Sequence, residues 1–121
     1  MTQFENNYDL EKRTMEFSGE LIELCKLCTK NIITIPLINQ VIRSGTSIGA
    51  NYREANGAAS KKDFQNKIFT CKKEAKETLY WLELMGKAIN DEKAIKDCRK
   101  LWQESKELTL IFSKIAYSTK K

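Results

Sequence analysis

The sequence predicts an all-α protein, an antiparallel up-down-up-down four-helix bundle that forms a single domain over residues 1–121. Four segments, roughly 9–30, 36–56, 61–89 and 92–117, carry apolar residues at intervals of three and four, the period of one helix face. Helices of this size are about 30 Å long, and the links are too short to carry the chain back, so neighbouring helices must run antiparallel. The chain has only five glycines and one proline, which disfavours a turn-rich β fold.

The first predicted helix has a regular apolar stripe on one face. Asp9 stands just before the stripe and suits the N-cap position. Gly19 lies inside the helix, where it is tolerated at an energetic cost. The stripe consists of Leu10, Thr14, Phe17, Leu21, Leu24 and Cys28.

The second predicted helix begins after a β-branched run at 31–35. Pro36 suits its first turn and pushes the preceding residue out of the helical region, which leaves Ile35 at or near the cap. The helix should end near Asn56 and Gly57. One face carries an apolar stripe made of Ile38, Val41, Gly45, Ile48, Tyr52 and Ala55.

The opposite face of this helix is unusual. Solvated helix faces are normally filled with Lys, Glu and Gln, yet between Arg43 and Arg53 there is no Lys or Glu. We therefore expect both faces to be covered, and we expect a partner for the charges of Arg43 and Glu54. Gly45 and Gly49 allow another backbone to approach closely, either within the chain or at a subunit interface. The candidate residues for an oligomer or helix-packing interface are Arg43, Gly45, Ser47, Gly49, Ala50, Glu54, Trp81 and Met85.

The third and fourth helices complete the predicted core. Ser60 and Asp63 resemble a capping box at the start of the third helix. Trp81 and Met85 widen its apolar stripe, which indicates either a broad core or a second covered surface. The third stripe consists of Phe64, Ile68, Cys71, Ala75, Leu79, Leu82, Gly86 and Ile89. The fourth consists of Ile95, Cys98, Trp102, Ser105, Leu108, Phe112 and Ile115.

The composition limits where the protein acts. No run of 18 apolar residues is present, so no membrane span and no membrane partner are expected, and the N-terminus shows no signal peptide. Four cysteines without a secretory signal are more typical of free thiols, which points to the cytoplasm.

The residue types argue against an enzyme. The chain has no histidine, which removes Ser-His and Cys-His nucleophile pairs and the Glu-x-x-His ligands of di-iron bundles. Glu20 with Glu23 and Glu74 with Glu77 are therefore interpreted as solvated faces. Cys25, Cys28, Cys71 and Cys98 are predicted to be buried core residues, with a zinc or redox site as the alternative. We expect no catalytic residues, no metal and no cofactor.

The net charge of +5 is concentrated in the second half of the chain. Lys72, Lys73 and Lys76 share roughly one helix face. These charges either are solvated or contact phosphate groups of a nucleic acid. The candidates for nucleic-acid contact are Arg53, Lys61, Lys62, Lys72, Lys73, Lys76, Arg99 and Lys100, with Lys120 and Lys121 at the C-terminal end.

Two segments carry a resemblance to a known family. QVIRSGTSIGANYRE at 40–54 and KEAKETLYWL at 73–82 resemble the bacterial four-helix-bundle proteins related to those encoded in intervening sequences of large-subunit ribosomal RNA genes. The resemblance covers nearly the whole chain and implies an antiparallel four-helix bundle, commonly a homopentamer. A related branch, the accessory proteins of diversity-generating retroelements, has a basic pentameric surface and binds nucleic acid and the reverse transcriptase. The resemblance therefore implies RNA or DNA, and a protein such as a reverse transcriptase, as candidate partners.

Two functions remain open from the sequence. The leading hypothesis is a non-enzymatic homo-oligomer that binds nucleic acid, RNA in the first place, through repeated basic patches. The alternative is a protein–protein interaction scaffold or adaptor that uses a surface around Trp81 and Met85 and binds no nucleic acid.

Overall fold

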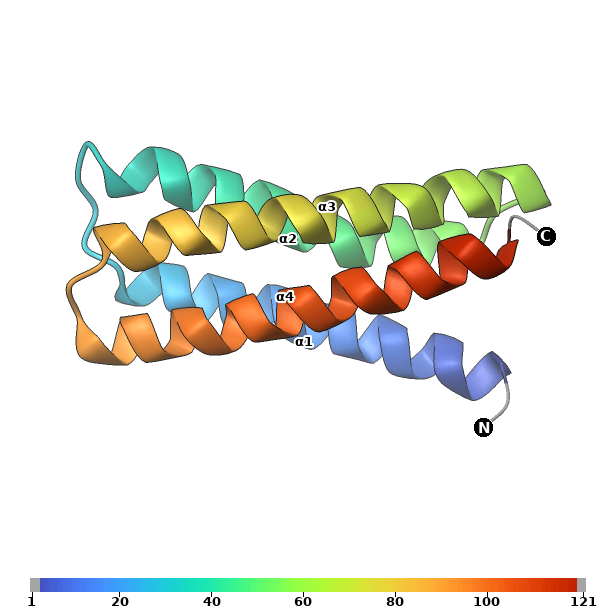
Figure 1. The fold of residues 1–121 in the computed structure, drawn as a ribbon, viewed down its shortest axis with the longest axis horizontal. Helices are drawn as coiled ribbons and strands as arrows, with labels where there is room; N and C mark the ends of the chain where they lie inside the picture. The colour runs from blue at the N-terminus through green and yellow to red at the C-terminus, as the bar shows by residue number, and fades with distance from the viewer. Residues whose placement is uncertain (1–2, 120–121) are drawn as a thin grey trace.

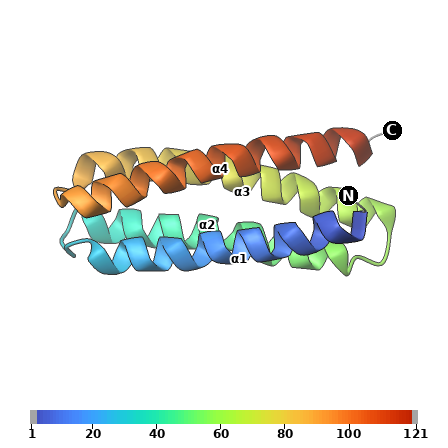
Figure 2. The ribbon, with the colours of Figure 1, turned by 90° about the horizontal axis from the view of Figure 1, so that it is seen from below.

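The structure is a computed structural model that describes residues 3–119, and within that range it is an all-α four-helix bundle without strands (Figure 1). The helices are α1 (Gln3–Leu27), α2 (Thr34–Asn56), α3 (Lys61–Ala88) and α4 (Glu92–Thr119). Figure 2 shows the α1–α2 and α3–α4 links at one end and the α2–α3 link with both termini at the other. Each helix packs on its neighbours in the chain, and α4 closes the bundle against α1. The predicted fold class is confirmed.

The bounds of α1 differ from the prediction at both ends. The helix begins at Gln3, so Asp9 lies inside it and is not its N-cap. Nothing between residues 3 and 9 is a proline or glycine that would break the helix. The helix ends at Leu27, and Lys30 lies beyond it. The ammonium of Lys30 donates to the carbonyl oxygens of Cys25 at 2.6 Å and Cys28 at 2.8 Å, which satisfies carbonyls at the helix end.

The start of α2 is also earlier than predicted. The helix begins at Thr34, and the cap position is taken by Ile33, whose side chain makes no capping bond, rather than by Ile35. The caps come instead from Asn31, whose Oδ1 accepts from the backbone N–H groups of Ile33 and Thr34, both at 2.9 Å. Thr34 Oγ1 in turn accepts from the backbone N–H of Asn31 at 3.0 Å. This reciprocal pair replaces the missing hydroxyl or carboxylate at the cap itself.

The remaining helix ends follow the prediction within two residues. Ser60 Oγ accepts from the backbone N–H of Asp63 at 3.1 Å, which confirms the predicted cap of α3. Asp91 Oδ2 accepts from the backbone N–H of Ala94 at 2.9 Å and caps α4. The helix α2 ends at Asn56 as predicted, whereas α3 ends one residue early and α4 ends two residues late.

The core is formed by the predicted stripes. All six residues of the α1 stripe are buried, as are Val41, Gly45, Ile48, Tyr52 and Ala55 of α2. Tyr52 and Phe112 meet edge to face with ring centroids 5.5 Å apart. Of the other predicted stripe members, Gly86 is exposed, and six are half-buried: Ile38, Phe64, Leu79, Ile95, Trp102 and Ile115. Every buried side-chain nitrogen and oxygen in the described part of the chain has a hydrogen-bond partner.

The two glycines of α2 bring it close to α1. A Cβ added at Gly45 would overlap Cδ1 of Leu21, and one at Gly49 would lie 3.1 Å from Oγ1 of Thr14. Larger residues would force the helices apart, so these glycines set the separation of α1 and α2. Among the helices described here, none is long and apolar enough to cross a membrane.

Candidate functional site

The surface that best matches the predicted basic site is the outer face of α3. Phe69, Lys73, Lys76 and Tyr80 are all exposed and follow one another at intervals of four, three and four residues, which places them in one row along the helix. Lys72 lies beside this row, with Nζ 5.5 Å from the centroid of the Phe69 ring. We call Phe69, Lys72, Lys73, Lys76 and Tyr80 the α3 row.

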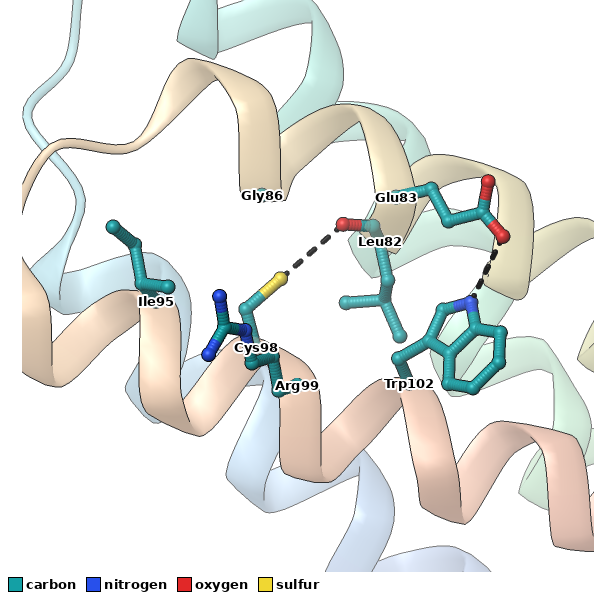
Figure 3. Close-up of a pocket in the computed structure, with 7 residues that line it drawn as sticks. All are labelled: Leu82, Glu83, Gly86, Ile95, Cys98, Arg99 and Trp102. Atoms are coloured by element: carbon teal, nitrogen blue, oxygen red, sulfur yellow. Dashed lines mark hydrogen bonds between the residues drawn. The ribbon is translucent and has the colours of Figure 1, made fainter.

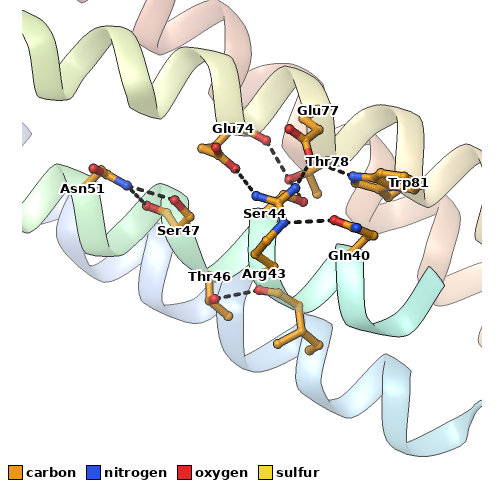
Figure 4. A network of polar contacts seen from close by, with 11 residues as sticks. Gln40, Arg43, Ser44, Thr46, Ser47, Asn51, Glu74, Glu77, Thr78 and Trp81 are labelled. Carbon is orange, nitrogen blue, oxygen red and sulfur yellow. Dashed lines mark hydrogen bonds and ion pairs between the residues drawn. The ribbon is translucent and has the colours of Figure 1, made fainter. Parts of the chain in front are cut away.

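A polar network on the side of α3 that faces α2 holds the acidic residues next to this row (Figure 4). The guanidinium of Arg43 donates to Oε2 of Glu74 at 3.3 Å, and its other terminal nitrogen pairs with Glu77. Arg43 Nε also donates to Gln40 Oε1 at 2.9 Å. The indole N–H of Trp81 donates to Glu77 Oε2 at 2.8 Å. Both carboxylates are therefore turned toward α2.

Buried polar groups also lie between α2 and α3, and they are hydrogen-bonded. The hydroxyl of Thr78 lies 2.8 Å from Ser44 Oγ and 2.7 Å from the carbonyl oxygen of Glu74, and all three residues are buried. Glu74 is 8% exposed. The prediction that Glu74 and Glu77 form an ordinary solvated face is therefore wrong, since both pair with a cation from the neighbouring helix. The carboxylates of Glu20 and Glu23 lie on exposed residues, as predicted.

The lysines of the α3 row are not paired with the acidic residues next to them in sequence. Glu74 and Glu77 are the acidic residues interleaved with them in sequence, and both are engaged by Arg43. None of Lys72, Lys73 and Lys76 makes an ion pair with a residue of the described range. A row of unpaired ammonium groups on one helix face attracts polyanions.

The other basic candidates lie elsewhere. Lys61 and Lys62 are exposed at the start of α3, whereas Arg53 lies between α1 and α2, with Nε 3.7 Å from Glu11. Lys100 lines the groove between α1 and α4, together with the acidic Glu20, Glu23 and Asp97. The eight predicted residues therefore do not form one surface, and Lys120 and Lys121 lie outside the described residues.

Arg99 lines a groove of about 330 Å³ between α3 and α4 (Figure 3). The Cys98 thiol donates to the carbonyl oxygen of Leu82 at 3.2 Å, and the Trp102 indole donates to Glu83 at 3.1 Å. Burial raises the pKa of Cys98 to about 11, so the thiol is protonated at neutral pH and is a poor nucleophile.

The remaining cysteines behave alike. All four are free and buried, as predicted. Burial raises the pKa of Cys25 to about 11 and that of Cys71 to about 12, and it also raises the pKa of Cys28. No group of three or more potential metal-binding side chains occurs in the part of the chain that the structure describes.

The predicted interface residues divide into two groups. Gly45 and Gly49 contact α1, so the intrachain alternative is correct for them. Met85 is 1% exposed and belongs to the core, so it cannot line the exposed surface expected around Trp81, which is itself half-buried.

The second group lies on the back of α2, where Arg43, Ala50 and Glu54 are exposed and Ser47 is half-buried. The expected partners of the two charges are present: Arg43 pairs with α3, and Glu54 lies 2.7 Å from Nζ of Lys67. The chain itself does not cover this face, so the cover expected for it remains a prediction.

Sequence reasoning missed the two aromatic members of the α3 row. Phe69 is 51% and Tyr80 57% exposed. Their signal was available, since both stand outside the buried stripe and at helical spacing from Lys73 and Lys76.

Comparison with known proteins identifies the family. The family model described as 23S rRNA-intervening sequence protein matches residues 6–110. The chain belongs to this family. A crystal structure similar to this member is that of a protein with unknown function from the S23 ribosomal protein family of Bacteroides thetaiotaomicron VPI-5482. The two chains are 32% identical, the match covers 92% of this chain and 97% of the other, and the TM-score is 0.76. A search of curated proteins gave no match.

Proposed function

We propose that this 23S rRNA-intervening sequence family protein is a non-enzymatic homo-oligomer that binds nucleic acid, RNA above all, through the α3 row of each subunit. The observation that carries the proposal is the engagement of Glu74 and Glu77 by Arg43. It turns the two acidic neighbours of Lys72, Lys73 and Lys76 toward α2 and offsets one of their two negative charges, which leaves the three ammonium groups unpaired for phosphate contacts.

Assembly of several subunits would raise the affinity that these lysines provide for nucleic acid. Three phosphate contacts from one subunit provide modest, salt-sensitive affinity. Identical subunits that engage one strand together raise the overall affinity without any new kind of contact. The exposed back of α2 around Ala50, which lacks the charged cover of an ordinary solvated helix, is the surface that we assign to this assembly.

The proposal is tested with a triple reversal, Lys72→Glu, Lys73→Glu and Lys76→Glu. Binding of a fluorescently labelled structured RNA is followed by anisotropy over a series of salt concentrations. If three phosphate contacts are lost in each subunit that engages the RNA, the slope of log K against log salt should become shallower by about 2–3 for each such subunit. A matched control reverses Lys12, Lys96 and Lys114, which are exposed on α1 and α4 and change the net charge equally.

The two triple variants distinguish binding by the α3 row from binding through net charge. A shallower slope and weaker binding in the α3 variant alone support the proposal. Equal loss in both triple variants would assign binding to net charge, and unchanged binding in the α3 variant would refute the site. Light scattering of the wild type measures the assembly, and a monomeric mass would refute the oligomer.

A further inference from the structure

From the two exposed aromatic rings we infer that the α3 row binds single-stranded nucleic acid and stacks unpaired bases on Phe69 and Tyr80. This inference rests on the proposed function, since the lysines of the row supply the phosphate contacts. It goes further by naming the strand state of the ligand and the two residues that select it.

The positions of the rings carry the argument. Phe69 and Tyr80 bracket Lys73 and Lys76 in one row, and both residues are just over half exposed. They are eleven positions apart, which is about 17 Å along a helix, or roughly the length of five nucleotides at the 3.4 Å rise of a stacked strand. A strand that lies along α3 can therefore meet a ring, then lysines, then a second ring.

The Tyr80 ring is held in place by its neighbours. It packs edge to face against Trp81, with ring centroids 5.0 Å apart and an interplanar angle of 70°. Trp81 in turn donates its indole N–H to Glu77, which is paired with Arg43. Because Trp81 packs against the core and its indole nitrogen is bonded to Glu77, it gives the Tyr80 ring a fixed neighbour, and Tyr80 loses little freedom when a base stacks on it.

Phe69 and Lys72 form the other end of the row. The ammonium of Lys72 lies 5.5 Å from the Phe69 ring centroid, within the range of a cation–π contact. A phosphate bound by Lys72 would therefore bring the attached base close to the Phe69 ring. Lys76 and Tyr80 are four residues apart and so are neighbours on the helix surface, which places a second lysine beside the second ring.

These rings distinguish the two strand states. In a duplex each base is already stacked on its neighbours and faces its partner strand, so an exposed ring on a helix surface gains nothing from it. In a single strand every base offers a free face, and aromatic stacking is largely independent of sequence. The lysines can contact the phosphates of a duplex or of a single strand, whereas the rings can stack only on the bases of a single strand.

The experiment compares a labelled oligo(dT) strand and a labelled duplex of equal length, with full-length wild type and two double variants. Phe69→Leu with Tyr80→Leu keeps apolar side chains but removes both rings. Phe69→Tyr with Tyr80→Phe keeps both rings and is the matched control. We expect the leucine variant to bind oligo(dT) more weakly by roughly thirty-fold or more, with an unchanged salt slope and unchanged duplex binding, and the control to bind like wild type.

Each result is decisive. Equal weakening for strand and duplex, or no weakening for the strand, would overturn the stacking role while leaving the lysine contacts intact. A wild type that binds neither ligand here, nor the structured RNA of the salt series, would refute the proposed function itself. A change of oligomeric mass in the leucine variant, measured by light scattering, would assign the two rings to a subunit interface and overturn the inference.

Discussion

Replacement of Gly45 by alanine tests the closest contact in the bundle. The added Cβ would overlap Cδ1 of Leu21 on α1, and the next nearest atoms to the same point are Cγ of Leu21 at 3.5 Å and Cε2 of Phe17 at 3.6 Å. Leu21 is 0% exposed, so its side chain can move only by displacing other core residues. Gly19 offers the matched control, because nothing lies within 4 Å of a Cβ placed there.

The magnitude follows from two opposing effects. Insertion of a methyl group into a packed core costs about 1–3 kcal/mol. Alanine in place of glycine in a helix returns about 1 kcal/mol. The overlap at Gly45 is deep, so we place the packing cost near its upper limit and expect a net loss of about 1–2 kcal/mol. Gly19→Ala, which meets no neighbour, should instead gain about 0.5–1 kcal/mol.

Urea unfolding followed by far-ultraviolet circular dichroism measures both changes by linear extrapolation. Gly49→Ala should lie between the two variants, because its Cβ would sit 3.2 Å from Cβ of Thr14, which requires a shift of only a few tenths of an ångström. Gly45→Leu should abolish the native packing and change the mass in light scattering. Equal stability of Gly45→Ala and Gly19→Ala would refute the contact of α2 with Leu21.

Three other predictions concern the ion pair between α2 and α3, the N-cap of α3 and the buried Cys71 thiol. Arg43→Met should lower the free energy of unfolding by about 1–3 kcal/mol, because buried Glu74 loses its cation, and adding Glu74→Gln should recover part of the loss in a double-mutant cycle. Ser60→Ala should lower it by about 1 kcal/mol through loss of the α3 cap, measured by urea unfolding. Burial raises the pKa of Cys71 from 9.0 to about 12, so between these values the unfolded chain loses a proton that the folded chain keeps. Stability should therefore fall as pH rises through this window, and urea midpoints at pH 8 and pH 10 should differ less in Cys71→Ala than in wild type.

The buried stripes were predictable because helical periodicity is a local property of the sequence. The stripe from Leu10 to Cys28 needed only the spacing of its members, and it is buried throughout. Helix ends were less predictable. The α2 cap depends on Asn31 and Thr34, which bond each other's backbone from a link that shows no periodic signal.

The candidate site was predictable only in part. The sequence placed the three lysines of the α3 row on one face. It could not show that Arg43, thirty-one residues before Glu74, pairs with the carboxylates of Glu74 and Glu77. That fact depends on how α2 packs on α3. Met85 was misplaced for a similar reason, since the width of the core is set by all the neighbouring helices together.

The sparse packing between α1 and α4 has a consequence for local unfolding of the bundle. These two helices are the least closely packed neighbours, and their ribbons diverge toward the N-terminus (Figure 1). Arg13 and Glu104 join them through hydrogen bonds of 2.6 and 2.8 Å. Because α2, α3 and α4 follow one another in sequence and share the closest contacts, they form a unit that can persist while α1 detaches. Native-state hydrogen exchange should show this as earlier amide exchange in α1 than in α3, at free energies below that of global unfolding.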